Sequence, residues 1–365
     1  MKRILFFADA SSVHTQRWVR EIAARGFECV VATRRPAEVP GARDVIALRP
    51  GGDPAGWLLA IPEVQRLARG VAPHWVHGHY VTSYGLWAAA SGLGPQVPVV
   101  LTAWGSDLLV TPRARGWRGS AMAALVGWSL RRAALVTADS QDVLDEVRRY
   151  GTSARCEEVV WGADTERFEP GKSAAGFEIA SLRSWEANYN LDTVLRAFAR
   201  LRAARPQAEA VLHLLGGGPD EAALRALAAE LELPEGAVRF TGRVGDAAML
   251  RTLQRARASV SVPSSDATSV SMLEAMACGL PVVASDLPAN REWLDAALLV
   301  PPRDASALAA ALLRLVDEPE FARAQGRRNR EVAVQRASRA AQMERMAVLY
   351  DAMRLQAPRP AERTA

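Results

Sequence analysis

The stretch from residue 258 to residue 285 reads ASVSVPSSDATSVSMLEAMACGLPVVAS and sets the architecture of the second half of the chain. Within it, Ala258–Val262 is a short apolar run that predicts a buried strand, and a serine-rich polar loop follows. A helix is expected to begin within Thr268–Ser271 and to end at a glycine, after which Val282–Ser285 predicts another strand. Strand, loop, helix and strand in this order form the repeating unit of a parallel α/β sheet.

The same alternation runs outward through both halves of the chain. Short apolar runs predict further buried strands at Ile4–Ala8, Val30–Thr33, Trp75–His77, Val99–Thr102, Phe177–Leu182, Ala210–Leu215 and Val238–Thr241. Helical spacing lies between them at Thr15–Arg25, Ser83–Ser91, Leu191–Ala204 and Asp220–Glu230. The predicted fold class is therefore α/β, with two Rossmann-like halves built on parallel sheets.

The boundary between the halves is expected near residue 160, ahead of the small, polar connection Gly171–Gly176. We expect one domain at residues 1–160 and a second at residues 161–335. In residues 336–365, a C-terminal helix would pack back on the first domain and end in a mobile tail; its helical pattern covers Asn329–Leu355. Ligands of open parallel sheets bind beyond the carboxyl ends of the strands, so two facing sheets predict a ligand cleft between the domains.

Composition narrows the class of protein. Of 365 residues, 49% are hydrophobic and 23% charged, which is typical of a soluble globular chain. No apolar run reaches the length of a membrane helix, and the first one ends at Asp9, too early for a signal peptide. Three scattered cysteines indicate neither zinc nor a disulfide framework, and they suit a cytoplasmic location. A net charge of +5 is too small to indicate a nucleic-acid partner.

The loop and helix after Ala258–Val262 can be interpreted in two ways. In the functional one, the unpaired N–H groups and positive dipole at the helix start hold a diphosphate, with Asp266 before the helix and Glu274 in its early turns. In the structural one, Ser271 and Glu274 form a capping box that only satisfies N–H groups at the helix end.

Residues 266–283 resemble the E-x7-E segment of retaining nucleotide-sugar glycosyltransferases of family 4, with an aspartate in place of the first glutamate. The resemblance implies two facing domains of the GT-B type. It implies that Asp266 contacts the sugar hydroxyls and that Glu274 binds the ribose of the donor. It also implies that the amides of the following loop hold the donor, at Thr268, Ser269, Val270 and Ser271.

Other segments resemble the same family. Arg183 stands where the family has an arginine that binds the donor diphosphate, a role suited to its forked donors. The family's lysine a few residues later is missing. Either Asn188 or Tyr189 donates a hydrogen bond there instead, or the diphosphate is held by Arg183 and the helix terminus. Further donor contacts are expected at the glycine-rich turn and at the base-reading stretch, namely at Gly217, Arg243 and Val244.

The first half contributes the acceptor side in this reading. Its candidates follow the predicted strands or lie near them: Ser12, His14, Arg17, His79, Trp104 and Asp107. Trp104 resembles the Trp-Gly-Ser-Asp loop of a bacterial surface-polysaccharide branch of the family and would stack on a sugar ring. The alternative for Trp104 and the histidines is ordinary packing. Likewise Arg113, Arg115, Trp117 and Arg118, ahead of Ala121–Leu130, form either a membrane-facing patch or a solvated loop.

The resemblance therefore implies a metal-independent hexosyltransferase without a cofactor. The donor would be a nucleotide sugar, UDP-linked in preference to GDP-linked, and the acceptor a saccharide or a lipid-linked sugar. Anomeric configuration would be retained, in cell-surface glycan synthesis, with Arg183, Asp266 and Glu274 as the catalytic set. Peripheral contact with the inner face of the membrane would suit a lipid-linked acceptor. A sugar-nucleotide epimerase and a non-catalytic nucleotide-sugar-binding subunit are the alternatives.

Overall fold

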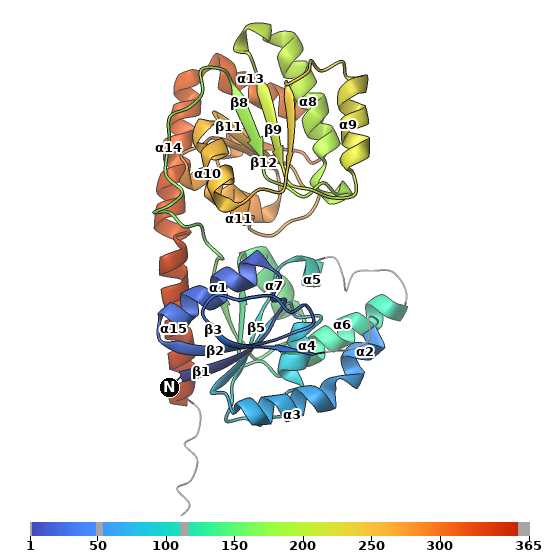
Figure 1. Cartoon of the computed structure of the whole chain (residues 1–365), viewed down its shortest axis with the longest axis vertical. Helices are drawn as coiled ribbons and strands as arrows, with labels where there is room; N and C mark the ends of the chain where they lie inside the picture. The colour runs from blue at the N-terminus through green and yellow to red at the C-terminus, as the bar shows by residue number, and fades with distance from the viewer. Residues whose placement is uncertain (1, 49–53, 110–116, 357–365) are drawn as a thin grey trace, which may run out of the picture. The chain divides into compact units, whose positions relative to one another are not determined.

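The computed structural model describes residues 2–48, 54–109 and 117–356. The chain divides into two compact units. Unit 1 consists of residues 1–161 together with residues 340–365, and unit 2 of residues 162–339. Each unit is a parallel sheet with helices on both of its faces (Figure 1).

The sheet of unit 1 has seven parallel strands in the order β3-β2-β1-β4-β5-β6-β7. Their bounds are β1 (Lys2–Phe7), β2 (Phe27–Thr33), β3 (Ala42–Ala47), β4 (Trp75–His79), β5 (Val99–Thr102), β6 (Leu135–Ala138) and β7 (Arg155–Glu158). Sequence analysis missed β3, β6 and β7. The first and last of these are edge strands with half-exposed, charged residues and so lack a strong apolar pattern. β6 is a short, fully buried run, LVTA, that the sequence analysis overlooked.

The described helices of unit 1 connect these strands and cover the sheet. They are α1 (Val13–Ala24), α2 (Pro54–Leu59), α3 (Ile61–Val71), α4 (Tyr84–Ala89), α5 (Ser106–Leu109), α6 (Trp117–Leu130), α7 (Gln141–Arg149) and α15 (Arg339–Gln356). The last helix packs on unit 1 through Tyr350, which is fully buried and whose carbonyl accepts from Trp75 Nε1 at 2.9 Å.

The sheet of unit 2 has six parallel strands in the order β10-β9-β8-β11-β12-β13. Their bounds are β8 (Glu178–Ser181), β9 (Val211–Leu215), β10 (Val238–Gly242), β11 (Ala258–Ser261), β12 (Val282–Ser285) and β13 (Leu299–Val300). The described helices are α8 (Leu191–Ala204), α9 (Glu221–Glu230), α10 (Asp246–Arg255), α11 (Val270–Ala277), α12 (Pro288–Arg291), α13 (Ala305–Asp317) and α14 (Pro319–Arg336). Its core is one cluster of aliphatic and aromatic side chains between the sheet and helices α8, α9 and α13.

The expected single helix over Asn329–Leu355 is wrong, because the chain leaves helical geometry between α14 and α15. There Ala163 N–H donates to Ala337 O and Arg339 N–H donates to Ala163 O, both at 2.8 Å, so that Ala163 and Ser338 form a parallel bridge. These bonds take backbone groups that a continuous helix would use. The predicted mobile tail falls on residues 357–365, which lie outside the described part of the chain.

Candidate functional site

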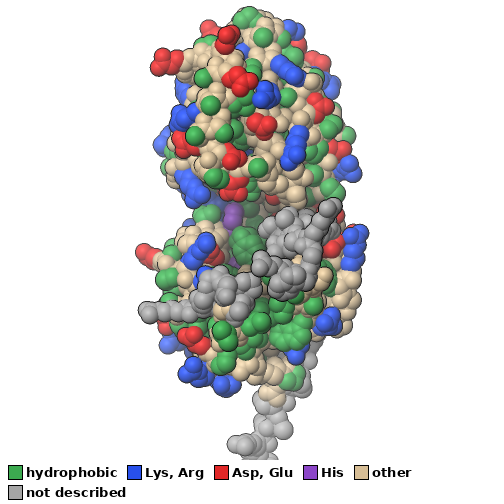
Figure 2. Space-filling view, turned by 90° about the vertical axis from the view of Figure 1, so that its right-hand side faces the viewer, with side chains coloured by type: hydrophobic (Ala, Val, Ile, Leu, Met, Phe, Trp, Pro, Cys, Tyr) green, Lys and Arg blue, Asp and Glu red, His purple; other side chains and the backbone are tan. Residues whose placement is uncertain are grey.

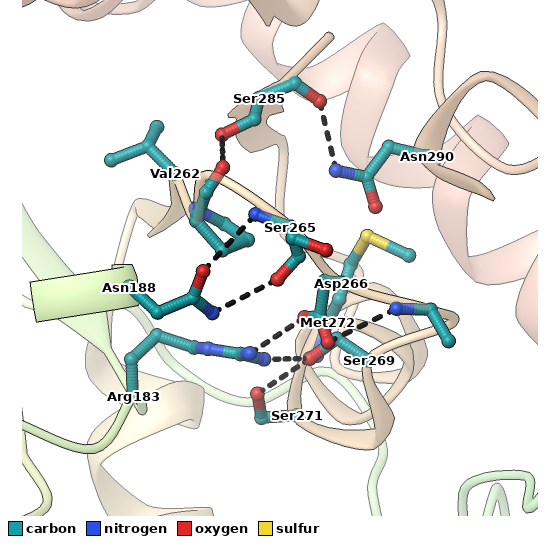
Figure 3. A network of polar contacts seen from close by, with 12 residues as sticks. Arg183, Asn188, Val262, Ser265, Asp266, Ser269, Ser271, Met272, Ser285 and Asn290 are labelled. Carbon is teal, nitrogen blue, oxygen red and sulfur yellow. Dashed lines mark hydrogen bonds and ion pairs between the residues drawn. The ribbon is translucent and has the colours of Figure 1, made fainter. Parts of the chain in front are cut away.

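Arg183 lies just beyond the carboxyl end of β8 and is the centre of a polar network in unit 2 (Figure 3). Its Nη2 donates to Asp266 Oδ2 at 2.6 Å and its Nη1 to Ser269 Oγ. The guanidinium carbon lies 4.4 Å from the centre of the Tyr189 ring. Arg183 is only 9% exposed, and its Nε finds no hydrogen-bond partner among the described residues. The site therefore holds a fixed cation with a donor to spare.

The start of α11 lies against this cation. Ser269 is the N-cap, because its Oγ accepts from Met272 N–H at 3.4 Å and its backbone is extended. Ser271 is already inside the helix, so the capping box of Ser271 with Glu274 is wrong. The buried Thr268 accepts from Trp293 Nε1 at 3.1 Å, which anchors the loop before the helix. The first N–H groups of α11, those of Val270 and Ser271, have no partner within the helix and carry its positive dipole.

Asp266 closes the network on its other side. Its Oδ1 accepts from Ala267 N–H at 3.1 Å while Oδ2 accepts from Arg183. Burial raises the pKa of the Asp266 carboxyl, although the Arg183 guanidinium acts in the opposite direction. A ligand that draws Arg183 away would leave this carboxylate in need of new hydrogen-bond donors, such as hydroxyl groups.

Asn188 has a different role from the one expected. It lies on a short 3₁₀ turn, Ala187–Tyr189, where its Nδ2 donates to Ser265 O at 2.9 Å and its Oδ1 accepts from Ser265 N–H at 3.2 Å. Both ends of the amide are thus bonded to the backbone of the loop after β11 (Figure 3). In this arrangement the Asn188 amide holds two loops together. Tyr189 contributes its ring to Arg183.

The turn after β9 passes close to the same place. A side chain on Gly216 would put a Cβ 2.2 Å from Arg183 O, so only glycine allows this approach. A Cβ on Gly217 would lie 3.4 Å from the Arg243 stem. Arg243 itself is exposed and Val244 half-buried, both just after β10. The fold thus brings Gly217 and Arg243 together beside the Arg183 backbone.

Glu274 lies on α11 and is 2% exposed. Its Oε1 is 3.8 Å from Nη2 of Arg339, which is 6% exposed. Sequence analysis missed Arg339, and no local pattern marks it, because it is one of many arginines and follows Glu274 by more than sixty residues.

In unit 1, several of the expected residues gather around Trp104. Its ring stacks on Tyr80 with centroids 4.3 Å apart and meets Trp161 edge-on at 4.3 Å. The half-buried His14 lies 5.6 Å from Trp104 and 5.7 Å from Trp161. We call these four residues, His14, Tyr80, Trp104 and Trp161, the aromatic cluster. Trp161 was not among the predicted site residues, and its part depends on the fold alone.

Two other expected residues lie at the start of α1. Ser12 is its N-cap position and makes no side-chain cap bond, and Arg17 is half-buried one turn further on. Both lie on the same helix as His14.

His79 and Asp107 are buried under the aromatic cluster. His79 has no exposed surface, its Nδ1 is 3.5 Å from Thr15 Oγ1, and burial lowers the pKa of its imidazole to about 3. Both oxygens of Asp107 accept from the backbone, Oδ2 from Val81 N–H at 2.6 Å and Oδ1 from Trp104 N–H at 3.0 Å. Asp107 therefore supports the loop that carries Trp104.

Two properties of the described residues bear on cofactors and membranes. In residues 2–48, 54–109 and 117–356 no three His, Cys, Asp or Glu side chains come together as a metal site would require. Over the same residues no helix combines the length and the apolar character needed to span a bilayer.

Comparison with known proteins follows the division into units. Residues 3–140 match the family described as "Glycosyl transferase 4-like", and residues 178–318 match the family described as "Glycosyl transferases group 1".

Curated relatives share part of this sequence. A GDP-mannose-dependent monoacylated alpha-(1-6)-phosphatidylinositol monomannoside mannosyltransferase of Corynebacterium glutamicum is 29% identical over 53% of this chain and 59% of its own length. A phosphatidyl-myo-inositol mannosyltransferase of Mycolicibacterium smegmatis is 34% identical over 37% of this chain and 35% of its own length. The MMP alpha-(1->4)-mannosyltransferase of Mycolicibacterium hassiacum is 30% identical over 55% and 49%. The chain thus spans between 35% and 59% of the length of these relatives.

Solved structures share the whole fold. Sucrose-phosphate synthase from Thermosynechococcus elongatus superimposes with a TM-score of 0.82 at 20% identity, covering 98% of this chain and 100% of its own. Anabaena Alr3699/HepE in complex with UDP-glucose gives 0.79 at 16% identity, covering 96% and 100%.

Proposed function

The chain belongs to the family 4-like glycosyltransferases of the GT-B fold, and we propose that it transfers a hexosyl group from a nucleotide sugar with retention of anomeric configuration. The observation that carries this proposal is the buried Arg183 guanidinium, held by Asp266 and Ser269 at the start of α11 with its Nε unpaired. A fixed cation beside free helix N–H groups is the chemistry that binds a diphosphate.

Each polar group of the network then has a task. Arg183 and the N–H groups of Val270 and Ser271 bind the diphosphate and stabilise the charge that develops on it as the glycosidic bond breaks. Asp266, released from Arg183, accepts from the hydroxyl groups of the sugar, and Glu274 accepts from the ribose hydroxyls. Because the guanidinium and the helix dipole supply positive charge, the leaving diphosphate needs no metal ion.

The donor we propose is a UDP-sugar, with GDP-mannose as the alternative. Alr3699/HepE, which shares the fold, was solved with UDP-glucose, whereas the C. glutamicum relative is named for GDP-mannose. Gly217, Arg243 and Val244 are the groups we assign to the nucleotide side of the site. Gly217 lies against the Arg243 stem, directly after Gly216, which packs on the Arg183 backbone, and Val244 follows Arg243.

The acceptor is proposed to bind at the aromatic cluster of unit 1. Apolar ring faces suit the C–H face of a pyranose, and the Trp104 Nε1 makes no hydrogen bond within the described residues, so it is available to a hydroxyl group. His14 is the polar member of this cluster, and Arg17 lies one turn further along the same helix, α1. We propose a saccharide or a lipid-linked sugar as the acceptor, in the synthesis of a cell-surface glycan.

A lipid-linked acceptor also implies contact with the inner face of a membrane, and one face of unit 1 suits it. Figure 2 shows apolar side chains gathered there, and Leu58 and Leu59 of α2 are 44% and 80% exposed. Neither α2 nor α6 contains an acidic residue, and the exposed Arg131 and Arg132 follow α6. An apolar face with basic neighbours favours an anionic lipid surface. The side chains of Arg113, Arg115, Trp117 and Arg118, which we expected in this patch, lie outside the described residues.

Calorimetric titration of the full chain with UDP and with GDP tests the donor site. We expect one nucleotide to bind and Arg183→Ala to weaken that binding by about 10- to 100-fold, the effect of losing charge-assisted hydrogen bonds. Arg225→Ala is the matched control, because that arginine pairs with Glu221 on the exposed face of α9. Binding of neither nucleotide, or equal affinity in Arg183→Ala, would overturn the assignment.

Turnover is tested with UDP-glucose and GDP-mannose. In slow donor hydrolysis followed by proton NMR, the first sugar released should have the anomeric configuration of the donor, and excess EDTA should leave the rate unchanged. Inversion of the anomeric centre would refute retention, and release of an epimerised sugar nucleotide would favour the epimerase. Tight nucleotide binding with neither hydrolysis nor transfer would identify a binding subunit.

A further inference from the structure

Glu274 and Arg339 form a buried ion pair that neither the motif nor the proposed chemistry includes. The side chains are 3% and 7% exposed, and Glu274 Oε1 lies 3.8 Å from Arg339 Nη2. This separation is longer than a hydrogen bond, so the contact is electrostatic. The guanidinium thus places positive charge beside the carboxylate.

A nearby cation helps a buried carboxylate to stay ionised. Without a nearby cation, burial favours the neutral form of an acid and raises its pKa by one or more units, to an extent that depends on the site. A carboxylate that accepts hydrogen bonds from two ribose hydroxyls has to be ionised, because the protonated group spends one oxygen on its own O–H.

Other charged and titratable groups lie on the elements packed against α11. Arg330 of α14 is used by the carbonyl oxygens of Phe168, Ala277 and Thr165. The Cys278 thiol has its pKa raised to about 12, first by burial and then by the charges of Glu274 and Glu169, so it stays neutral. The strands β11 and β12, which α11 also contacts, consist only of alanine, serine and valine.

The backbone holds Arg339 in place. Its N–H donates to Ala163 O at 2.8 Å, and its Nη2 also donates to Gly162 O at 3.2 Å. Gly162 has a φ of +70°, and a Cβ there would lie 2.7 Å from Arg339 Cα. A side chain at position 162 would therefore displace Arg339 without changing its charge, which offers a second way to disturb the pair.

We propose that Arg339 is a positioning residue that keeps the Glu274 carboxylate ionised for the ribose of the donor, so that donor affinity depends on the charge at position 339. The inference rests on the proposed function, because it assigns Glu274 to the donor.

The test compares the wild-type chain with Arg339→Gln, Arg339→Lys and Glu274→Gln in titrations with UDP and GDP between pH 6 and pH 8.5. Arg339→Gln should bind at least about tenfold more weakly than the wild type at pH 6.5 and approach it as the pH rises, because Glu274 then ionises. Arg339→Lys should restore most of the affinity, and Gly162→Ala should weaken it. Glu274→Gln should bind weakly at every pH. Arg323→Gln, which removes an exposed arginine paired with Glu320 on α14, is the control and should bind like the wild type.

A readout without ligand separates this inference from the proposed function. In urea unfolding, the stability gap between wild type and Arg339→Gln should widen as the pH rises from 5 to 8. In the variant, the folded state keeps a proton on Glu274 that the unfolded chain has lost. The difference in stability should no longer change with pH when both proteins also carry Glu274→Gln.

The outcomes are distinct. If the wild type binds neither nucleotide, the proposed function fails, while the unfolding slopes still decide whether Arg339 ionises Glu274. If the wild type binds, a variant that matches it at every pH overturns the inference. A loss of affinity that is independent of pH and not rescued by lysine would also overturn it, since it would mark a purely structural role.

Discussion

At the scale of single residues, burial in unit 1 sets the charge state of several polar side chains. His77 is fully buried between Tyr350 OH at 2.5 Å and Thr102 Oγ1 at 2.7 Å, and burial holds the pKa of its imidazole well below the usual range. His79, on the same strand, is also kept neutral by burial. For an acid, burial shifts the pKa in the opposite direction, and it raises the pKa of the Asp107 carboxyl to about 6.

Asp107 therefore predicts a particular pH dependence of stability. Because its pKa is higher in the folded state than the ordinary value of 3.8, the folded protein retains a proton that the unfolded chain loses, and this contribution to stability disappears as the pH rises. Relative to Asp107→Asn, the wild type should lose about 2 kcal/mol of unfolding free energy between pH 4.5 and pH 7.5. Urea unfolding of both proteins measures the difference. A gap that stays constant over this range, or grows with pH, would show that Asp107 is ionised in the fold.

At the scale of elements, the loop between β11 and α11 is built by bonds from three directions. Ser269 caps the helix, Asn188 pairs with Ser265 from the 3₁₀ turn, and Ser285 Oγ donates to Pro263 O at 2.7 Å from the end of β12. Asn290 in turn donates to Ser285 O (Figure 3). The helix start that we assign to the diphosphate is thus held rigidly before any ligand arrives, which lowers the cost of binding.

Two neighbouring serines test this account of the helix start. Ser269→Ala removes the N-cap and one partner of Arg183, so it should lower the unfolding free energy by about 1 kcal/mol and also weaken nucleotide binding. Ser271→Ala is the matched variant, because Ser271 lies two residues further on, inside the helix, with its Oγ 3.0 Å from Ser269 Oγ. Urea unfolding and calorimetry on both variants make the comparison. A larger effect from Ser271→Ala would restore the capping box that the structure contradicts.

At the scale of the whole molecule, the chain has two cores and its last helix completes the first of them. Tyr350 of α15 is buried against His77 and Trp75 of β4, and Lys2 of β1 pairs with Asp351 at 2.6 Å. Unit 1 therefore needs helix α15 for its stability, although unit 2 lies between α15 and the rest of unit 1 in the sequence.

Hydrogen exchange should resolve the two units. Tyr350→Phe leaves the His77 Nδ1 without its buried partner, which should cost unit 1 about 1–3 kcal/mol and raise exchange in β1 and β4 but not in β8–β12. Val348→Ala, on the exposed side of α15, should change little. Adding the nucleotide that binds should protect residues around Arg183 and Glu274 in unit 2 only. Equal changes in both units would contradict this division.

Local pattern was enough to predict the α/β class, the two halves and the strand, loop and helix around Asp266. Apolar periodicity and turn residues are local signals, because each can be seen within a few positions of the chain. The predicted helix Leu191–Ala204 and the predicted strand Val282–Ser285 match the structure residue for residue. Where the pattern was weak, as in the edge strands β3 and β7, prediction failed.

Contacts between distant residues were decided by the tertiary structure alone. Arg339 beside Glu274, Trp161 in the aromatic cluster and the break between α14 and α15 all join segments far apart in the chain. The amide of Asn188 is a further case, since only the fold shows that Ser265 occupies both of its ends. Strands and helices with a strong apolar pattern can be predicted from the sequence, because that pattern depends on neighbouring residues. Which side chain then faces which charge depends on how the elements pack, and no local spacing encodes that.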